Sequence, residues 1–398
     1  MKEVFSKTRI GCLTALAALG LPASAVDIVI PKIKPAEEEL DPIRHRGLRL
    51  SIFDVAVNIA ASAIYDDNIY ISGRKPAGDL TISFTPGFNA STGGPDEKSL
   101  ALAYTPNFVF FVEQGKNNSI EHAASLAARW PMAKLTLGMG ESFQSTSGSV
   151  TDVGNRVNQQ SYSTTLTSHY AWTEKTSFEI NGTYNIHDYK NLIGSEDWSD
   201  ANWINYQIKP KLSLSLGLTL GYNNVQRQPS QTYEESSVRA TYIVTGKISV
   251  NGSIGGQWRQ FGGGVPQQFG MIFGLGASYL PRDGTFFTLE SHRRNDNSAV
   301  LAGQNYTTTG LNVSVRQRVF DKLFVILAGG IDQADYTATT TRVVATRKDT
   351  YYTGRLGLDY RVSDRWQAGV FYQYRRNNST GPFGFDDNQF GVQGSYSF

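Results

Sequence analysis

Apolar and polar residues alternate along most of the chain, in segments of about ten residues. The clearest segment runs from Leu212 to Tyr222, where leucines occupy every second position and Ser, Gly or Thr fill the positions between them. Successive side chains of a strand point to opposite faces, so one face of this strand is apolar and the other is small and polar. Such a polar face cannot fill a sandwich core. We therefore expect the leucines to face lipid and the small side chains to line a water-filled lumen.

The same alternation predicts about eighteen strands, with 16 or 20 as alternatives because the register of the first two hairpins is the least defined. An even number of antiparallel strands is typical of bacterial outer-membrane barrels. The sequence thus predicts an all-β fold, a transmembrane antiparallel up-and-down β-barrel with both termini in the periplasm. The expected strands lie at 50–62, 79–88, 99–111, 119–130, 133–144, 160–172, 176–188, 199–208, 211–223, 236–245, 247–259, 269–279, 285–293, 306–319, 322–333, 350–361, 365–376 and 388–398.

The links between these strands alternate in length. Very short links, such as 210–211 and 320–322, alternate with long polar ones, such as 145–159 and 333–348. Short periplasmic turns and longer outer loops are typical of outer-membrane barrels, so the link lengths support the barrel independently of the strand pattern.

Aromatic residues gather at the expected strand ends, where the rings of Trp and Tyr favour the boundary between lipid and water. A soluble sandwich or β-helix would instead bury aromatic residues in the middle of its strands. The rings expected at the periplasmic ends are Trp130, Trp172, Tyr279, Phe287, Tyr360, Trp366 and Phe398; those expected at the outer ends are Phe110, Tyr162, Tyr184, Tyr222, Trp258, Tyr306, Tyr352, Tyr372 and Phe390.

The N-terminal residues have the pattern of an export signal. Residues 1–25 carry a basic start, a short apolar stretch and a small-residue cleavage site after Ala25, which predicts a secretory signal peptide. Residues 26–49 are rich in Pro and charges and predict an extended periplasmic leader, and residues 50–398 form the expected barrel. The single cysteine, Cys12, lies in the signal, so no disulfide or Cys-ligated metal is expected in the mature chain.

Composition and motifs exclude several function classes. The 398 residues include 37 Lys and Arg against 35 Asp and Glu, and removal of the signal leaves 34 of each, so a nucleic-acid partner is not expected. The five His residues lack metal-site spacing, and each Ser–His neighbour pair would point to opposite faces of a strand. We therefore expect no enzyme activity, no catalytic residue and no cofactor.

Charged side chains are expected on the lumen side, where the alternation places more cations than anions. A basic lining biases a pore toward anions, whereas the alternative is a ladder of ion pairs across strands. The expected lumen cations are Lys134, Lys209, Lys211, Arg239, Arg259, Arg316, Arg318, Arg355, Arg361 and Arg375, and the expected lumen anions are Glu121, Glu179, Glu290 and Asp359.

The two ends of the barrel carry further candidate residues. Alternate positions of the last strand, Phe390, Val392, Tyr396 and Phe398, resemble the terminal signal that the barrel assembly machinery reads, because a free last strand must pair before closure.

Two acidic triplets, Asp66-Asp67-Asn68 and Asp386-Asp387-Asn388, are expected to meet on the outer rim when the barrel closes. The preferred interpretation is that they end strands through Asx turns, so no metal is predicted. Calcium bound by Asp66, Asp67, Asp386 and Asp387 is the alternative hypothesis.

The stretch Ala63–Tyr70, A-I-Y-D-D-N-I-Y, together with Thr85-Pro86-Gly87 and the stretch Leu102–Phe108, resembles the opening of the beta-barrel porin-2 family. The resemblance implies an outer-membrane barrel with a porin-like or exopolysaccharide-related role. We expect an integral barrel in the lipid of a Gram-negative outer membrane that acts as a passive channel for small hydrophilic solutes. The alternative is a non-conducting structural or polysaccharide-export accessory barrel, and the sequence leaves open whether a homo-oligomer forms.

Overall fold

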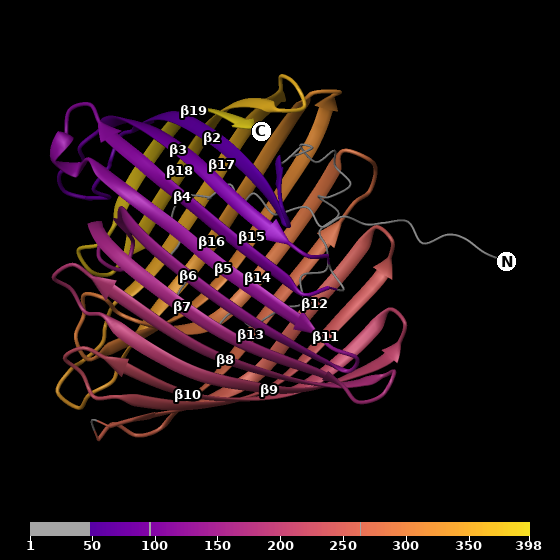
Figure 1. The fold of residues 1–398 in the computed structure, drawn as a ribbon. Coiled ribbons are helices and arrows are strands. Elements are labelled where there is room, and N and C mark those ends of the chain that lie inside the picture. The colour runs from indigo at the N-terminus through magenta and orange to yellow at the C-terminus, as the bar shows by residue number, and fades with distance from the viewer. Residues whose placement is uncertain (1–47, 95–96, 263) are drawn as a thin grey trace.

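The computed structural model describes residues 48–94, 97–262 and 264–398. Its strands form one antiparallel barrel in which each strand pairs with the next along the chain. The barrel closes where β19 pairs with β2, from Gln389 opposite Asp66 to Ser397 opposite Asn58 (Figure 1). The barrel strands are β2 (Phe53–Asp66), β3 (Asp79–Thr92), β4 (Ser99–Phe111), β5 (Ser119–Pro131), β6 (Leu135–Val150), β7 (Asn155–Ala171), β8 (Thr176–Tyr189), β9 (Ser195–Lys209), β10 (Leu212–Val225), β11 (Gln231–Thr245), β12 (Ile248–Phe261), β13 (Gln268–Tyr279), β14 (Thr285–Asn297), β15 (Gln304–Phe320), β16 (Leu323–Ala338), β17 (Lys348–Arg361), β18 (Trp366–Ser379) and β19 (Phe385–Ser397).

Strands β2 to β19 make eighteen barrel strands, which confirms the predicted antiparallel barrel and the preferred strand number. The alternatives of 16 and 20 strands are wrong. A short strand β1 (Leu48–Leu50) forms a hairpin with the start of β2, and a 3-10 turn η2 (Gly115–Asn117) lies between β4 and β5. None of the helices in the described part of the chain is long and apolar enough to cross a membrane.

The first expected strand began three residues too early. The structure places β1 and a bend at Ser51, whose φ is +60°, before β2 starts at Phe53. The predicted signal peptide and residues 26–47 of the predicted leader lie outside the described residues.

The two ends of the barrel differ in their connections. At one end, here the short-turn end, links such as 210–211 and 321–322 join the strands, and β2 begins and β19 ends there. At the other end, the long-loop end, links such as 298–303 and 339–347 are longer. The predicted alternation of link lengths is therefore present in the structure.

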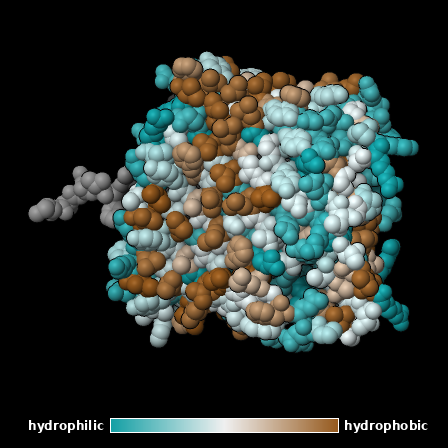
Figure 2. Space-filling model, turned by 180° about the vertical axis from the view of Figure 1, so that it is seen from behind, coloured by the Kyte–Doolittle hydropathy of each residue, from teal (hydrophilic) through white to brown (hydrophobic). Residues whose placement is uncertain are grey.

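The outer surface carries the apolar side chains of each strand. On β10, Leu216 is 62% exposed, whereas the intervening Ser215 and Thr219 are each 6% exposed because they point inward. On the face seen in Figure 2, apolar side chains gather toward the short-turn end and polar side chains cover the long-loop end. This distribution fits a barrel whose short-turn part meets lipid and whose long-loop part meets water.

Most of the predicted aromatic residues lie on this outer surface, and pairs such as Trp258 and Phe269 pack side by side there. The predicted place of Tyr306 at the lipid boundary is wrong, because its ring packs inside the barrel against Tyr336 with a ring separation of 5.0 Å. Tyr306 lies an even number of positions from the inward-pointing Arg316, and no bulge intervenes, so the alternation itself places its ring on the lumen side.

The small residues of β10 face large rings as well as open space. A Cβ atom on Gly217 would lie 2.5 Å from the Trp203 ring, and one on Gly221 would lie 2.0 Å from the Tyr233 ring. The glycines that predicted a water-filled lumen therefore also make room for two inward-pointing aromatic side chains.

Candidate functional site: the charged lumen and its constriction

Twelve of the fourteen charged residues expected in the lumen lie on the lumen face, the face of each strand opposite to its exposed apolar side chains. This placement follows from the period-two alternation, and register pairs such as Arg239 with Ser215 and Arg316 with Phe286 agree with it. Lys134 and Lys211 lie in short turns rather than on the wall. The side chains on the lumen face are Glu121, Glu179, Lys209, Arg239, Arg259, Glu290, Arg316, Arg318, Arg355, Asp359, Arg361 and Arg375.

One predicted cation is part of an ion pair that spans four neighbouring strands, β8 to β11. Arg239 on β11 donates to Glu179 on β8 and to Asn205 on β9, each at 3.0 Å. Its guanidinium also lies 4.4 Å from the ring of Trp203. Arg239 is only 5% exposed, so it supports the wall and offers little charge to a passing solute.

A second predicted cation is buried in a network of amides and carboxylates. Arg259 donates to Gln231 at 3.0 Å and to Gln257 at 3.2 Å, and its guanidinium lies 4.9 Å from the Tyr233 ring. Gln257 donates in turn to the carboxylate of Glu235 at 2.5 Å. For Arg239 and Arg259, the structure favours the alternative of ion-pair and hydrogen-bond ladders over a free basic lining.

A different arrangement occurs on β15 to β18. Arg316 and Arg355 lie over the rings of Phe324 and Phe371, at 4.6 and 3.8 Å, and both remain half-buried. The nearby carboxylate of Asp359 is buried. Cations held on aromatic faces stay oriented while part of the charge remains available, so this arc is the basic part of the lumen.

The long-loop half of β14 and β15 does not continue the wall. Strands β13 and β14 pair only over Phe273–Tyr279 and Phe287–Arg293. Beyond this point, Asn295 on β14 donates to Gln257 on β12 at 2.5 Å, so the chain passes behind β13 on the lumen side. The end of the β14–β15 hairpin therefore lies inside the barrel.

Further hydrogen bonds hold this hairpin against the inner wall. Asn297 donates to Asn223 on β10 at 3.1 Å, and Asn305 donates to Gln231 on β11 at 2.7 Å. The backbone N–H of Ile193, in the β8–β9 loop, donates to the carbonyl oxygen of Ala299, in the β14–β15 loop, at 2.9 Å. Part of the lumen cross-section at this level is consequently filled by protein.

A second hairpin, β6–β7, enters from the opposite side of the barrel. Its tip carries Asp152, which is 8% exposed and accepts hydrogen bonds from Ala299 N at 2.7 Å, Ser298 Oγ at 3.1 Å and Tyr336 Oη at 2.7 Å. Arg347 adds an ion pair at 3.4 Å. Residues up to 195 positions apart in sequence thus meet at one carboxylate. We call this contact the Asp152 latch.

Arg347 contacts several loops at the Asp152 latch. It is paired with Asp349 at 2.5 Å, donates to the carbonyl oxygens of Thr151 and Asp152, and lies 3.7 Å from the ring of Phe383. Gly154, at φ +66°, lies against the same ring, where a Cβ atom would come within 2.8 Å. Three loops are thereby packed into one constriction.

Burial raises the pKa of the Asp152 carboxyl above its ordinary value, although Tyr336 and Arg347 act in the opposite direction. Burying the charged form of Asp152 is therefore unfavourable in free energy, and the three hydrogen-bond donors and Arg347 partly offset this penalty.

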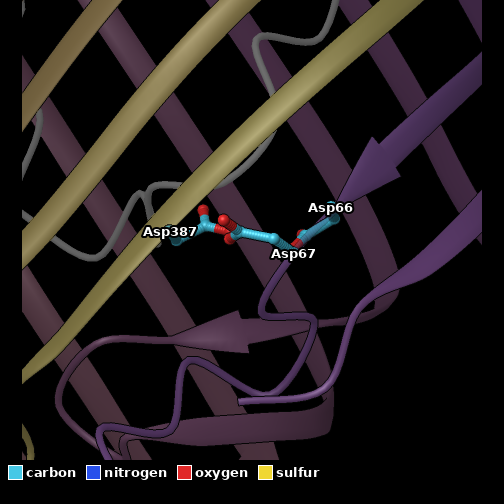
Figure 3. A group of neighbouring side chains, drawn as sticks. All are labelled: Asp66, Asp67 and Asp387. Carbon is cyan, nitrogen blue, oxygen red and sulfur yellow. The ribbon is translucent and has the colours of Figure 1, made fainter.

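The two acidic triplets meet at the long-loop end of the β2–β19 seam. One oxygen from each of Asp66, Asp67 and Asp387 lies within 4.8 Å of the others (Figure 3). Asp386 does not join them, because its side chain is 60% exposed and accepts a hydrogen bond from Tyr374.

The expected assembly residues lie on one face of the last strand. Phe390, Val392 and Phe398 are 59%, 53% and 42% exposed, and Tyr396 packs on Trp366 at 4.8 Å. Their role in assembly stays a prediction.

Sequence reasoning did not find Asp152, Arg347, Ser298 or Tyr336. Each stands alone in a loop or at a strand end, and no local spacing indicates that the four meet. Gly154, two residues after Asp152, indicates a turn, but it does not indicate where the turn packs.

No protein-family profile matches the chain, and no curated protein matches it. Solved structures with a similar fold include OpdK of Pseudomonas aeruginosa with vanillate, at 12% identity and a TM-score of 0.43, covering 87% of this chain and 98% of that one. OccAB3 of Acinetobacter baumannii has 8% identity and a TM-score of 0.46, covering 87% and 99%. OccK2 (OpdF) of Pseudomonas aeruginosa has 10% identity and a TM-score of 0.47, covering 87% and 98%. These values carry no argument about the solute or mechanism of this chain.

Proposed function

We propose that the protein is a porin-like outer-membrane channel for small hydrophilic solutes. The observation that carries this proposal is the closed barrel of eighteen strands, with apolar side chains outside and charged or amide side chains inside. Barrels of 16 to 18 strands leave space for an aqueous channel. Channel activity is the use that such a polar interior supports best.

The basic arc on β15 to β18 favours anions. Arg316, Arg318 and Arg355 are half-buried on the lumen face, and the neighbouring Asp359 is buried. Partly exposed guanidinium groups lower the entry energy of anions, and salt screens this effect. Glu290 is an exposed carboxylate on the same face, so the preference is for anions over cations rather than for anions alone.

The constriction limits what can pass. The β6–β7 and β14–β15 hairpins both occupy the long-loop half of the lumen, so a solute must be small unless the Asp152 latch opens. The same constriction supports the second candidate, a non-conducting structural or polysaccharide-export accessory barrel.

Planar-bilayer recording of the refolded barrel distinguishes the two candidates. A porin-like channel gives ohmic conductance steps, and under a KCl gradient its reversal potential shows chloride preference. Absence of conductance steps in both wild type and a latch variant would support the accessory barrel.

The double variant Arg316→Gln with Arg355→Gln tests the basic arc. We expect the chloride preference to fall while the conductance remains. Lys175→Gln, in an exposed short turn, is the matched control and should leave selectivity unchanged. Equal selectivity in the double variant and the wild type would contradict the assignment.

The remaining assignments belong to the same proposal. The barrel lies in outer-membrane lipid of a Gram-negative bacterium after export by the signal at residues 1–25 and insertion by the barrel assembly machinery, with both termini in the periplasm. Its resemblance to the beta-barrel porin-2 family supports this placement, and the expected absence of enzyme activity stays a prediction. Whether the barrel forms a homo-oligomer is left to measurement of its size in detergent.

A further inference from the structure

Three carboxylates meet where the first and last barrel strands close. Asp66 ends β2, Asp67 follows it, and Asp387 is the third residue of β19. One oxygen of each lies within 4.8 Å of the others. Calcium binds oxygen at 2.3 to 2.6 Å, so two ligands on opposite sides of one ion are about 4.6 to 5.2 Å apart. The spacing therefore fits a single calcium ion between the three side chains.

The charges of the cluster are not balanced by its protein contacts. Arg375 donates from Nε to Asp387 at 2.5 Å and lies 3.7 Å from Asp66. Arg156 also acts electrostatically on Asp66, so three carboxylates stand against two guanidinium groups and the cluster stays net negative. A cation would neutralise the excess.

One oxygen of the cluster is buried without a partner. The side chain of Asp387 is 0% exposed, its Oδ1 has no N–H or hydroxyl donor among the described residues, and its carboxyl group lies within hydrogen-bonding distance of Asp66. In Figure 3 the carboxylates of Asp387 and Asp67 point toward each other. A buried carboxylate oxygen without a donor is costly, and two facing carboxylates add repulsion. An ion between them would remove both costs.

The other two carboxylates are held in place from behind. The backbone N–H of Asn388 donates to Asp67 Oδ1, and its side-chain amide donates to Oδ2, each at 2.8 Å. Gln389 donates to Asp66 at 2.8 Å. A carboxylate oxygen can accept such a bond and still bind a metal, and outer partners of this kind orient metal ligands.

A cavity lies at the same rim of the barrel. Its volume is about 480 Å³, and it is lined in part by Asn68 and Asp386, the sequence neighbours of Asp67 and Asp387. Water molecules from this side would complete the six to eight oxygen ligands that calcium takes.

We propose that Asp66, Asp67 and Asp387 bind one calcium ion that clasps the closing seam of the barrel. This reverses the preferred interpretation of the sequence, in which the triplets only end strands, and it removes Asp386 from the candidate ligands.

The test uses the full barrel folded in detergent, with melting followed by circular dichroism in excess EGTA or in millimolar calcium chloride. We expect calcium to raise the wild-type melting temperature by a few degrees, because a ligand that binds only the folded state stabilises it. Isothermal titration with calcium chloride should give one site. A wild-type melting temperature indifferent to calcium, with no heat of binding, overturns the proposal.

Three variants separate ion binding from a purely structural role. Asp387→Asn should lose the calcium response; its melting temperature in EGTA combines the lost repulsion with the lost ion pair to Arg375. Asp67→Asn should also lose the response, and it serves if the first variant fails to fold. Asp386→Asn, the matched control, should keep it. A calcium response that persists in both Asp387→Asn and Asp67→Asn would place the ion elsewhere and refute the assignment, as would a stabilisation produced by acid alone.

Discussion

The Asp152 latch makes a quantitative prediction for the variant Asp152→Ala. The substitution removes the acceptor of Ser298, Ala299 and Tyr336 and one of the two carboxylates paired with Arg347. Removing one partner of a buried ion pair costs about 3 to 5 kcal/mol. Because Arg347 keeps Asp349, and because burial already penalises the Asp152 charge, we take the lower value of about 3 kcal/mol.

A cost of about 3 kcal/mol changes the ratio of latched to released hairpin by roughly 150-fold. A latch that is closed about 99% of the time would then be closed about 40% of the time. Single-channel recording should show longer or larger conductance states in Asp152→Ala, and limited proteolysis should cut the β6–β7 hairpin faster. Asp152→Asn keeps an acceptor oxygen and should give an intermediate result.

Asp335→Ala is the matched control for this experiment. Asp335 also lies at the long-loop end, but its side chain is 34% exposed and pairs with Lys348 on the surface at 3.5 Å. Its loss should leave both conductance and proteolysis unchanged. The reasoning about the latch is refuted if Asp152→Ala matches the wild type in both measurements while remaining folded.

Three further predictions use other measurements. Burial raises the pKa of Asp152, so the latched state binds the proton more tightly than the released state does. This stabilisation is complete below about pH 4 and is lost as the pH rises through the raised pKa. The closed fraction should therefore be larger at acidic than at neutral pH, and Asp152→Asn should abolish the difference. Met139→Arg, on the exposed apolar face, should lower the free energy of unfolding by about 2 to 4 kcal/mol. Gly140→Arg, on the adjacent inward face, should cost much less, because a Cβ atom there meets nothing closer than 3.9 Å. Equal costs in urea titrations would contradict the assignment of the two faces. An epitope inserted at Val344, which is 83% exposed at the long-loop end, should bind antibody on intact cells, and one at Asp321 in a short turn should bind only after the cells are opened; the reverse result would place the short turns outside.

The sequence predicts the wall of this barrel well, because strand alternation is a local property. A period of two decides the face of Leu216 and of Arg316 alike, whatever the distant strands do. The same rule gives the number of strands, whereas Lys134 and Lys211, at the ends of expected strands, lie in short turns.

The constriction could not be predicted, because it depends on residues that are far apart in sequence. Nothing near Asp152 indicates that Ser298 and Tyr336 will donate to it, since such a meeting is decided by the closed barrel. Tyr306 shows a different limit: a ring at a strand end predicts a lipid boundary only when it lies on the outer face, and the parity of Tyr306 with Arg316 places it on the lumen face. Gly217 indicates a small side chain correctly, yet the Trp203 ring that fills the space comes from another strand.

The incomplete pairing of β13 with β14 limits how deeply the barrel can sit in its membrane. Beyond Phe273, the backbone of β13 has a strand on its β12 side, and among the described residues it has no strand on the other. Arg293 Nε donates to the Met271 carbonyl at 3.1 Å, but the other peptide groups on this edge have no strand partner among the described residues. Unpaired peptide groups facing hydrocarbon cost several kcal/mol each, so this stretch fits the headgroup layer and not the lipid tails. Next to it, the Trp258 and Phe269 rings lie at the same height, where the headgroups would begin. The interruption in the wall therefore sets how deep the barrel lies in its membrane: the lipid tails cover the short-turn part, and the rest of β13 lies in the headgroup layer and the water beyond it.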